Sequence, residues 1–183
     1  MNRGDVERLL LAARCVIHHQ DYVIIGSLSI LGALETPPQS MTGSIDVDLY
    51  PRDDPGRAGE VALALGLGSH FEQEFGYYAD AVSPALPTLP QDWESRLIPI
   101  AFASGVTAWC LDPDDAAISK YVRGEPRDRQ WIQAGLAQGV LSIATIDYRL
   151  RELTTMDHAE RVRAKIAIAE DRAWLAASPG IAP

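Results

Sequence analysis

The fold of this chain is decided by residues Tyr22–Pro51, which read YVIIGSLSILGALETPPQSMTGSIDVDLYP. Two short apolar runs within this stretch predict strands, Val23–Ile25 and Ile45–Leu49. Side chains alternate between the two faces of a strand, so Asp46 and Asp48 are expected on one face. The apolar residues of the second run are then expected in a core. The stretch therefore predicts a sheet that carries an acidic pair on one side.

Two carboxylates on one apolar strand are costly to bury, because each ion loses its hydration. A divalent cation offsets this cost, and hard oxygen ligands suit Mg²⁺. Two such ions held roughly 4 Å apart can stabilise both the attacking and the leaving oxygens of a phosphoryl transfer. The spacing of Asp46 and Asp48 therefore predicts a Mg²⁺ site. A solvent-facing strand edge is the alternative explanation of the same pattern.

A glycine and a serine follow the first predicted strand. Gly26 ends that strand, and Ser27 opens a run of apolar residues with helical spacing. A helix N-terminus offers unbonded N–H groups and a partial positive charge, both of which favour a phosphate. Glycine lets a ligand approach the backbone, and the serine hydroxyl adds a donor. Gly26 and Ser27 are therefore candidate phosphate-binding residues, with a simple turn as the alternative.

The order of strand, Gly-Ser, helix, loop and a strand bearing Asp-Val-Asp resembles the signature of polymerase-beta-like nucleotidyltransferases. Within that superfamily the chain is most similar to bacterial proteins related to abortive-infection and toxin–antitoxin nucleotidyltransferases. The resemblance implies an α/β fold, in which a mixed twisted sheet is flanked by helices. It also implies Mg²⁺-dependent transfer of a nucleoside monophosphate from a nucleoside triphosphate onto an acceptor.

A third carboxylate lies in a short predicted strand further along the chain. Tyr78, Asp80 and Val82 share one face of that strand, and Asp80 is the lone acid of an apolar segment. The related nucleotidyltransferases use a third carboxylate on a neighbouring strand, either as a metal ligand or as the base for the acceptor hydroxyl. By that match Asp80 joins Asp46 and Asp48. A solvent-facing aspartate is the alternative.

Cationic residues cluster where two predicted helices meet. Lys120 and Arg123 lie three apart on one helix and share a face, and the next helix carries Arg127 and Asp128 in its first turn. Related toxin-like nucleotidyltransferases have a lysine on such a helix, then a basic residue and an aspartate at the next one. By that resemblance Lys120 contacts triphosphate oxygens with help from Arg123 or Arg127. Asp128 then orients the lysine or a base, and a solvated helix face that pairs acids with bases is the alternative.

Composition limits the class of protein. The 183 residues are 47% hydrophobic and 22% charged, which suits one globular domain or a domain with a helical appendix. A net charge of −9 argues against broad nucleic-acid binding, although a local basic patch for an RNA acceptor stays open. Without a long apolar run or a signal-peptide pattern, we expect a cytoplasmic protein with no membrane partner. Cys15 and Cys110 are expected to be buried thiols.

The pattern divides the chain into two predicted parts. Residues 1–112 are expected to form the nucleotidyltransferase core, and residues 113–183 a helical region packed on it, with one continuous domain as the alternative. Asp112–Asp115 has the acids and the proline of a helix start and is expected to be structural. The last predicted helix, Asp157–Leu175, is expected to face inward through Val162, Ile166, Ala169 and Ala173.

These patterns together predict a Mg²⁺-dependent nucleotidyltransferase with a nucleoside triphosphate as substrate. Its acceptor is expected among RNA such as tRNA, protein and small molecules, and no residue pattern selects the base of the triphosphate. A toxin with an antitoxin protein as its partner is implied by resemblance alone. Two alternatives stay open: a catalytically silent nucleotide-binding or partner-binding module of the same fold, and an interaction protein with no ligand site.

Overall fold

The computed structural model describes residues 1–154 and 156–178. The chain forms two compact units. The first comprises Met1–Leu86 and Arg96–Asp112 and contains a sheet, whereas the second comprises Pro87–Ser95 and the described residues from Pro113 onward and is helical.

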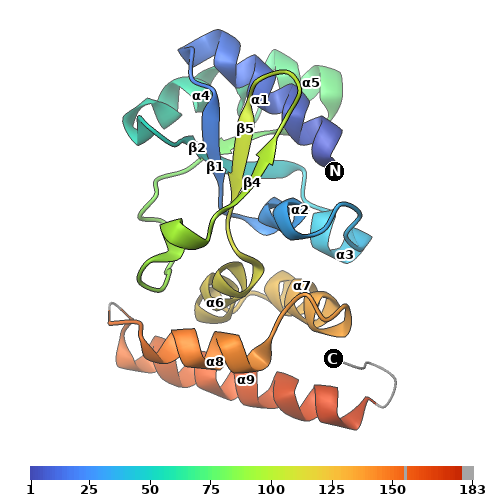
Figure 1. The fold of residues 1–183 in the computed structure, drawn as a ribbon, viewed down its shortest axis with the longest axis vertical. Helices are drawn as coiled ribbons and strands as arrows, with labels where there is room; N and C mark the ends of the chain where they lie inside the picture. The colour runs from blue at the N-terminus through green and yellow to red at the C-terminus, as the bar shows by residue number, and fades with distance from the viewer. Residues whose placement is uncertain (155, 179–183) are drawn as a thin grey trace. The chain divides into compact units, whose positions relative to one another are not determined.

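The first unit is built on a five-stranded sheet with the strand order β3-β2-β1-β5-β4. β1 is antiparallel to β2 and parallel to β5, β2 is parallel to β3, and β4 is antiparallel to β5. Figure 1 shows β1, β5 and β4 side by side. The predicted α/β class and mixed sheet are therefore confirmed. The strands are β1 (Asp21–Ile24), β2 (Asp46–Pro51), β3 (Tyr78–Ala81), β4 (Ile98–Ala101) and β5 (Thr107–Cys110).

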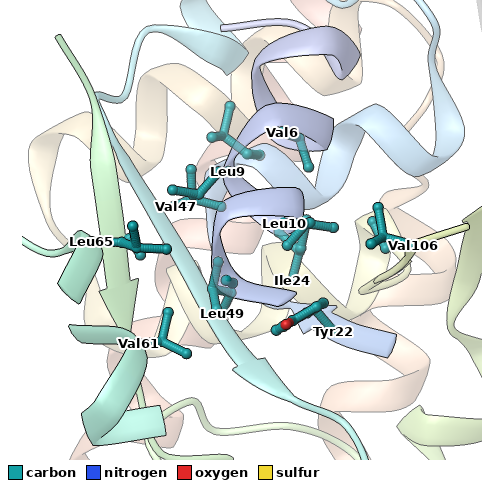
Figure 2. Close-up of a cluster of buried hydrophobic side chains, with 14 of the residues drawn as sticks. Val6, Leu9, Leu10, Tyr22, Ile24, Val47, Leu49, Val61, Leu65 and Val106 are labelled. Carbon is teal, nitrogen blue, oxygen red and sulfur yellow. The ribbon is translucent and has the colours of Figure 1, made fainter. Parts of the chain in front are cut away.

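One face of the sheet is covered by α1 (Arg3–Ile17) and α4 (Ala58–Leu65). A capping box starts α1, because the Asn2 side chain accepts from the Asp5 N–H and the Asp5 carboxylate accepts from the Asn2 N–H. Figure 2 shows how apolar side chains of both helices pack on alternate strand residues, including Val6, Leu9, Leu10, Tyr22, Ile24, Val47, Leu49, Val61, Leu65 and Val106. Since side chains alternate along β2, this packing leaves Asp46 and Asp48 on the opposite face.

The segment between β1 and β2 holds short elements rather than the longer helix predicted after Ser27. Leu34 has extended backbone, and the prolines at positions 37 and 38 keep the chain from resuming a helix at once. Ile45, expected in the core, is 55% exposed because β2 begins only at Asp46. The elements here are the 3-10 turn η1 (Ser27–Ser29), α2 (Ile30–Ala33) and α3 (Gln39–Thr42); η2 (Pro55–Arg57) and α5 (His70–Phe75) complete this unit.

The second unit is a set of helices joined through buried aspartates. Asp115 is fully buried and accepts from Nη1 of Arg149 at 2.8 Å, which links α6 to α8. Asp171 is also fully buried and accepts from the Tyr121 hydroxyl at 3.0 Å and the Gln133 amide at 2.9 Å, which links α9 to α6 and α7. Figure 1 shows α8 and α9 lying side by side. The helices are α6 (Pro113–Arg123), α7 (Pro126–Ala137), α8 (Ile143–Arg151) and α9 (His158–Ala177), and η3 (Trp93–Arg96) lies between β3 and β4.

The predicted inward face of α9 is wrong. Val162 and Ile166 are 42% and 55% exposed, whereas the buried residues are Ala164, Ile168 and Asp171. These three follow the i, i+4, i+7 spacing of one helix face. Asp171 can occupy a core position because Tyr121 and Gln133 donate hydrogen bonds to it there. A pattern of apolar residues alone leaves a charged residue out of the core, so it selects the neighbouring face of the helix.

The cysteines differ from each other in exposure. Cys110 is buried, and burial raises the pKa of its thiol to about 12. Cys15, which was also expected to be buried, is exposed on α1. Among residues 1–154 and 156–178, no helix combines the length and the apolar character that crossing a bilayer requires.

Replacing Leu49 by Ala tests the core beneath the acidic pair. Leu49 is fully buried between the sheet and its helices, so we expect Leu49→Ala to lower the free energy of unfolding by about 2–5 kcal/mol. Leu63 is 88% exposed on α4, and Leu63→Ala is expected to change it by no more than about 0.5 kcal/mol. Urea unfolding followed by circular dichroism measures both; equal effects would contradict this core.

Candidate functional site

Three acidic side chains gather on the face of the sheet away from α1 and α4. The parallel register of β2 and β3 sets Asp48 beside Asp80 and Asp46 beside Tyr78. One carboxylate oxygen from each of the three aspartates lies within 4.8 Å of the other two. Asp46 and Asp48 are partly buried, and Asp80 is exposed. The structure thus brings together the three carboxylates that the sequence pattern singled out.

Asp46 is oriented by Ser44, a residue that carries no motif of its own. The Ser44 hydroxyl donates a hydrogen bond to Oδ1 of Asp46. Such a bond restricts the rotamer of a carboxylate and directs its other oxygen, as outer hydrogen bonds do around metal ligands. The only sequence signal for Ser44 is a hydroxyl two residues before the first acid of the Asp-x-Asp pair.

Gly26 is required by the position of Asp48. A Cβ atom built on Gly26 would lie 2.5 Å from Cγ and 2.9 Å from Cβ of Asp48, so even alanine would overlap that carboxylate. The two strands meet closely here, since the Ile25 N–H donates to the Asp48 carbonyl at 3.1 Å. A residue without a side chain is therefore needed at position 26 on steric grounds, whether or not a ligand binds there, because it leaves room for one of the three acids.

Ser27 lies in a tight turn rather than at the start of a long helix. The Ser29 N–H donates to the Gly26 carbonyl at 3.1 Å and closes this turn. The three residues of η1 and the four of α2 align too few peptide groups for a strong helix dipole. Any phosphate binding here therefore depends on local N–H and hydroxyl donors. Within the described residues, the hydroxyl of Ser29 is buried and has no hydrogen-bond partner, which adds a second hydroxyl to the same turn.

The acidic cluster is electrostatically unfavourable without a cation. Although Asp80 is exposed, partial loss of water around its carboxylate, and then the negative charge of Asp46, raise its pKa above the ordinary value. Burial followed by the charges of Asp46 and Asp80 likewise raises the pKa of Tyr78. Each shift means that further negative charge at this place is disfavoured. A bound cation would relieve this repulsion.

The donor set suits a hard divalent cation. All three converging groups are carboxylates, which Mg²⁺ and Mn²⁺ prefer and which distinguish the cluster from the thiolate and imidazole sets of zinc sites. Asp46, Asp48 and Asp80 are the residues that would hold the ion. Their separation is short enough for a common ion, and Gly26 keeps the space beside Asp48 clear.

In the helical unit, Lys120, Arg123 and Asp128 form a second charged cluster. Asp128 is 1% exposed; it accepts from Nε and Nη2 of Arg123 at 2.9 and 2.6 Å, and its Oδ1 lies 3.4 Å from Nζ of Lys120. Burial alone would raise the pKa of Asp128, but the Arg123 hydrogen bonds and the Lys120 charge outweigh it and hold the pKa below its usual value. Nζ of Lys120 also lies 4.9 Å from the centre of the Trp131 ring. Nε of Arg123 also lies 3.7 Å from a carboxylate oxygen of Glu125, so acids and bases alternate in this cluster.

Arg127, also named as a candidate from the sequence, lies outside this cluster. Its Nε bonds to Glu125 at 2.8 Å, and its side chain is 67% exposed. Glu125 and Asp128 form the capping box that begins α7, which explains why acids and bases alternate at this helix start. Lys120 and Arg123 are therefore the two cations that the structure joins to Asp128.

Gly26→Ala is expected to weaken binding of Mg²⁺ by at least tenfold, because the added methyl displaces the Asp48 carboxylate. Gly59→Ala is the matched control, since a Cβ there meets no atom within 4 Å. Isothermal titration of each variant with Mg²⁺ makes the comparison, with circular dichroism as a check of folding. Unchanged affinity in a folded Gly26→Ala variant would contradict the steric role of this glycine.

Asp128→Ala is expected to lower the free energy of unfolding by about 3–5 kcal/mol, because it removes the buried acid that pairs with Lys120 and Arg123. Asp147→Ala provides a comparison. Asp147 pairs with Arg151 and Arg172, whose side chains are mostly exposed, and its loss should cost about 0–1 kcal/mol. Thermal unfolding distinguishes the two, and equal losses would show that the Asp128 cluster is no more than a surface network.

Comparison with known proteins identifies the family of the chain. The family model described as nucleotidyltransferase of unknown function (DUF6036) matches residues 6–174, which include both charged clusters. The curated proteins and the solved structures give no significant match. Since the family model covers nearly the whole chain, the chain belongs to this family of nucleotidyltransferases.

Proposed function

We propose that the protein is a Mg²⁺-dependent enzyme that transfers a nucleoside monophosphate from a nucleoside triphosphate to an acceptor hydroxyl. The observation that carries this proposal is the convergence of Asp46, Asp48 and Asp80 from two parallel strands onto one face. Membership of a nucleotidyltransferase family supports nucleotidyl transfer in general. The metal requirement, the acceptor and the residue roles are part of the proposal.

The three aspartates hold the metal in this proposal. Bound Mg²⁺ supplies charge neutralisation for the phosphates and for the oxygen that attacks. Ser44 keeps the Asp46 carboxylate aimed at the site through its hydrogen bond. Gly26 leaves the room that the Asp48 carboxylate occupies.

The candidate phosphate-binding residues named from the sequence complete the proposal. The N–H groups of the turn after Gly26 and the Ser27 hydroxyl contact phosphate oxygens. Lys120 and Arg123 supply positive charge toward the leaving pyrophosphate, while Asp128 fixes the position of the lysine. Arg127 can contact the triphosphate only if its exposed ion pair with Glu125 breaks.

The step itself exchanges one phosphorus–oxygen bond for another. The acceptor oxygen forms a bond to the α-phosphorus, the bond from the α-phosphorus to the bridging oxygen breaks, and pyrophosphate leaves with that bonding pair. The proton of the acceptor hydroxyl passes to a carboxylate or to solvent. Asp80 is either the third metal ligand or the base that takes this proton, since it is the most exposed of the three acids.

The acceptor and the biological role in this proposal rest on the resemblance to toxin–antitoxin nucleotidyltransferases. An RNA such as tRNA, a protein and a small molecule are the acceptor classes. A toxin restrained by an antitoxin protein, acting in the cytoplasm, is the role that the resemblance to toxin–antitoxin nucleotidyltransferases supports.

Asp48→Asn tests the enzyme directly. With triphosphates labelled at the α-phosphorus, Mg²⁺ and cell extract, we expect label to reach an acceptor with the wild type. The transfer rate should fall by at least about a hundredfold in Asp48→Asn, because a group that supports transition-state charge is lost. Asp53→Asn, an exposed acid just past β2, is the control and should retain the rate.

The nature of the labelled material identifies the acceptor, and growth arrest by the wild type but not by Asp48→Asn is expected of a toxin. Equal labelling by Asp48→Asn and the wild type would reject the catalytic role. Calorimetry that detects Mg²⁺-dependent triphosphate binding by a wild type without transfer would identify a silent nucleotide-binding module instead.

A further inference from the structure

One side of the long helix α9 (Figure 1) carries an apolar stripe that the fold leaves exposed. Its residues recur at alternating intervals of three and four, which is the spacing of the a and d positions of a coiled coil. This spacing is typical of a helix that packs along its length against another helix. The stripe, called the α9 seam below, consists of the exposed residues Ala159, Val162, Ile166, Ala169, Ala173 and Ala176.

The helical unit does not cover the seam, because α9 packs on that unit through its opposite side. Ala164 and Asp171 are fully buried and occupy the heptad position farthest from the seam, and Ile168 beside them is also buried. This buried side makes the contacts of α9 with α6, α7 and α8. Helix α9 therefore has two apolar faces, and the fold uses one of them.

The seam is long but provides few large side chains. The 20 residues of α9 correspond to about 30 Å of helix. Val162 and Ile166 are the large residues of the seam, and the others are alanines. Alanines let a partner helix approach closely, so the apolar area that stabilises the contact has to come mainly from large side chains of the partner. A second copy of α9 would bring mostly alanines and would supply little of that area.

The residues that flank the seam carry positive charge. Arg163, Lys165 and Arg172 occupy the e and g positions, where coiled coils place the charges that select a partner. Arg172 pairs with an aspartate of α8 at 3.3 Å, whereas Arg163 and Lys165 have no ion pair within the described residues. Glu170 also flanks the seam, but it already pairs with an arginine of α7 at 3.0 Å. In a chain with a net charge of −9, the seam is thus bordered by cations that lack an acid.

We propose that the α9 seam binds an amphipathic helix of another protein, with large apolar residues on its contact face and acidic residues beside them. The apolar residues fill the space over the alanines, and the acids pair with Arg163 and Lys165. A second copy is disfavoured because it brings the same cations to the contact, and a nucleic acid would leave the apolar seam in water. No seam residue belongs to either charged cluster, so this contact is separate from the proposed transfer reaction.

Two synthetic peptides test the seam and its flanking charge. Both form a helix of three heptads with leucine at the a and d positions; the acidic peptide has glutamate at e and g, and the basic peptide has lysine there. By fluorescence anisotropy, we expect the acidic peptide to bind at least tenfold more tightly than the basic one. The net charge of the protein favours the reverse order, so this result requires a local match of charge.

Ile166→Lys should weaken binding of the acidic peptide at least tenfold, although it adds a positive charge, because it removes the largest apolar side chain of the seam. Leu63→Lys is the matched control, since Leu63 is 88% exposed on α4 and lies outside the seam, and it should leave binding unchanged. Arg163→Glu combined with Lys165→Glu should reverse the order of the two peptides. Circular dichroism checks that each variant is folded.

Absence of binding by both peptides, equal binding of the two, or indifference to Ile166→Lys would each overturn the proposal. A dimer of the protein alone, detected by sedimentation and dissociated by Ile166→Lys, would overturn it in favour of a second copy. Tight binding of a single-stranded RNA that the double charge reversal abolishes and Ile166→Lys leaves intact would overturn it in favour of a nucleic-acid surface.

Discussion

The repulsion among three carboxylates on neighbouring strands is the constraint on which the rest of the molecule depends. Parallel pairing of β2 with β3 sets Asp48 directly beside Asp80, and like charges in adjacent positions of a sheet are destabilising. The apolar residues between the acids hold this geometry, because Val47 and Leu49 are fixed in the core beneath α1 and α4. The fold thus stabilises an arrangement that its own charges oppose, and a bound cation would resolve the conflict.

In the helical unit, buried acids lie beside cations or hydrogen-bond donors rather than beside other acids. Its buried aspartates are each provided with protein partners: Asp115 with Arg149, Asp128 with Arg123 and Lys120, and Asp171 with Tyr121 and Gln133. Buried ions with such partners fix how helices pack, whereas removal of one partner is costly. These structural acids lie against cations or hydrogen-bond donors of neighbouring helices, whereas the candidate functional acids Asp46, Asp48 and Asp80 lie within reach of one another.

The sequence could predict features that depend on local periodicity. Alternation along one strand was enough to put Asp46 and Asp48 on one face, and the order of strand, Gly-Ser, helix and acidic strand was enough for the resemblance that implied an α/β fold. It could not fix the register that sets Asp80 beside Asp48, because strand pairing is non-local. Nor could it foresee that Asp171 takes a core position on α9, or that Gly26 is required by the carboxylate of a strand about twenty residues away.

The most direct measurement is the anomalous scattering of Mn²⁺ in crystals grown with Mn²⁺ and a non-hydrolysable nucleoside triphosphate analogue. We expect a strong peak bounded by carboxylate oxygens of Asp46, Asp48 and Asp80, at metal–oxygen distances of about 2.0–2.3 Å. Crystals that contain the bound analogue but show no such peak, with the three side chains turned apart, would contradict a metal site on this face of the sheet.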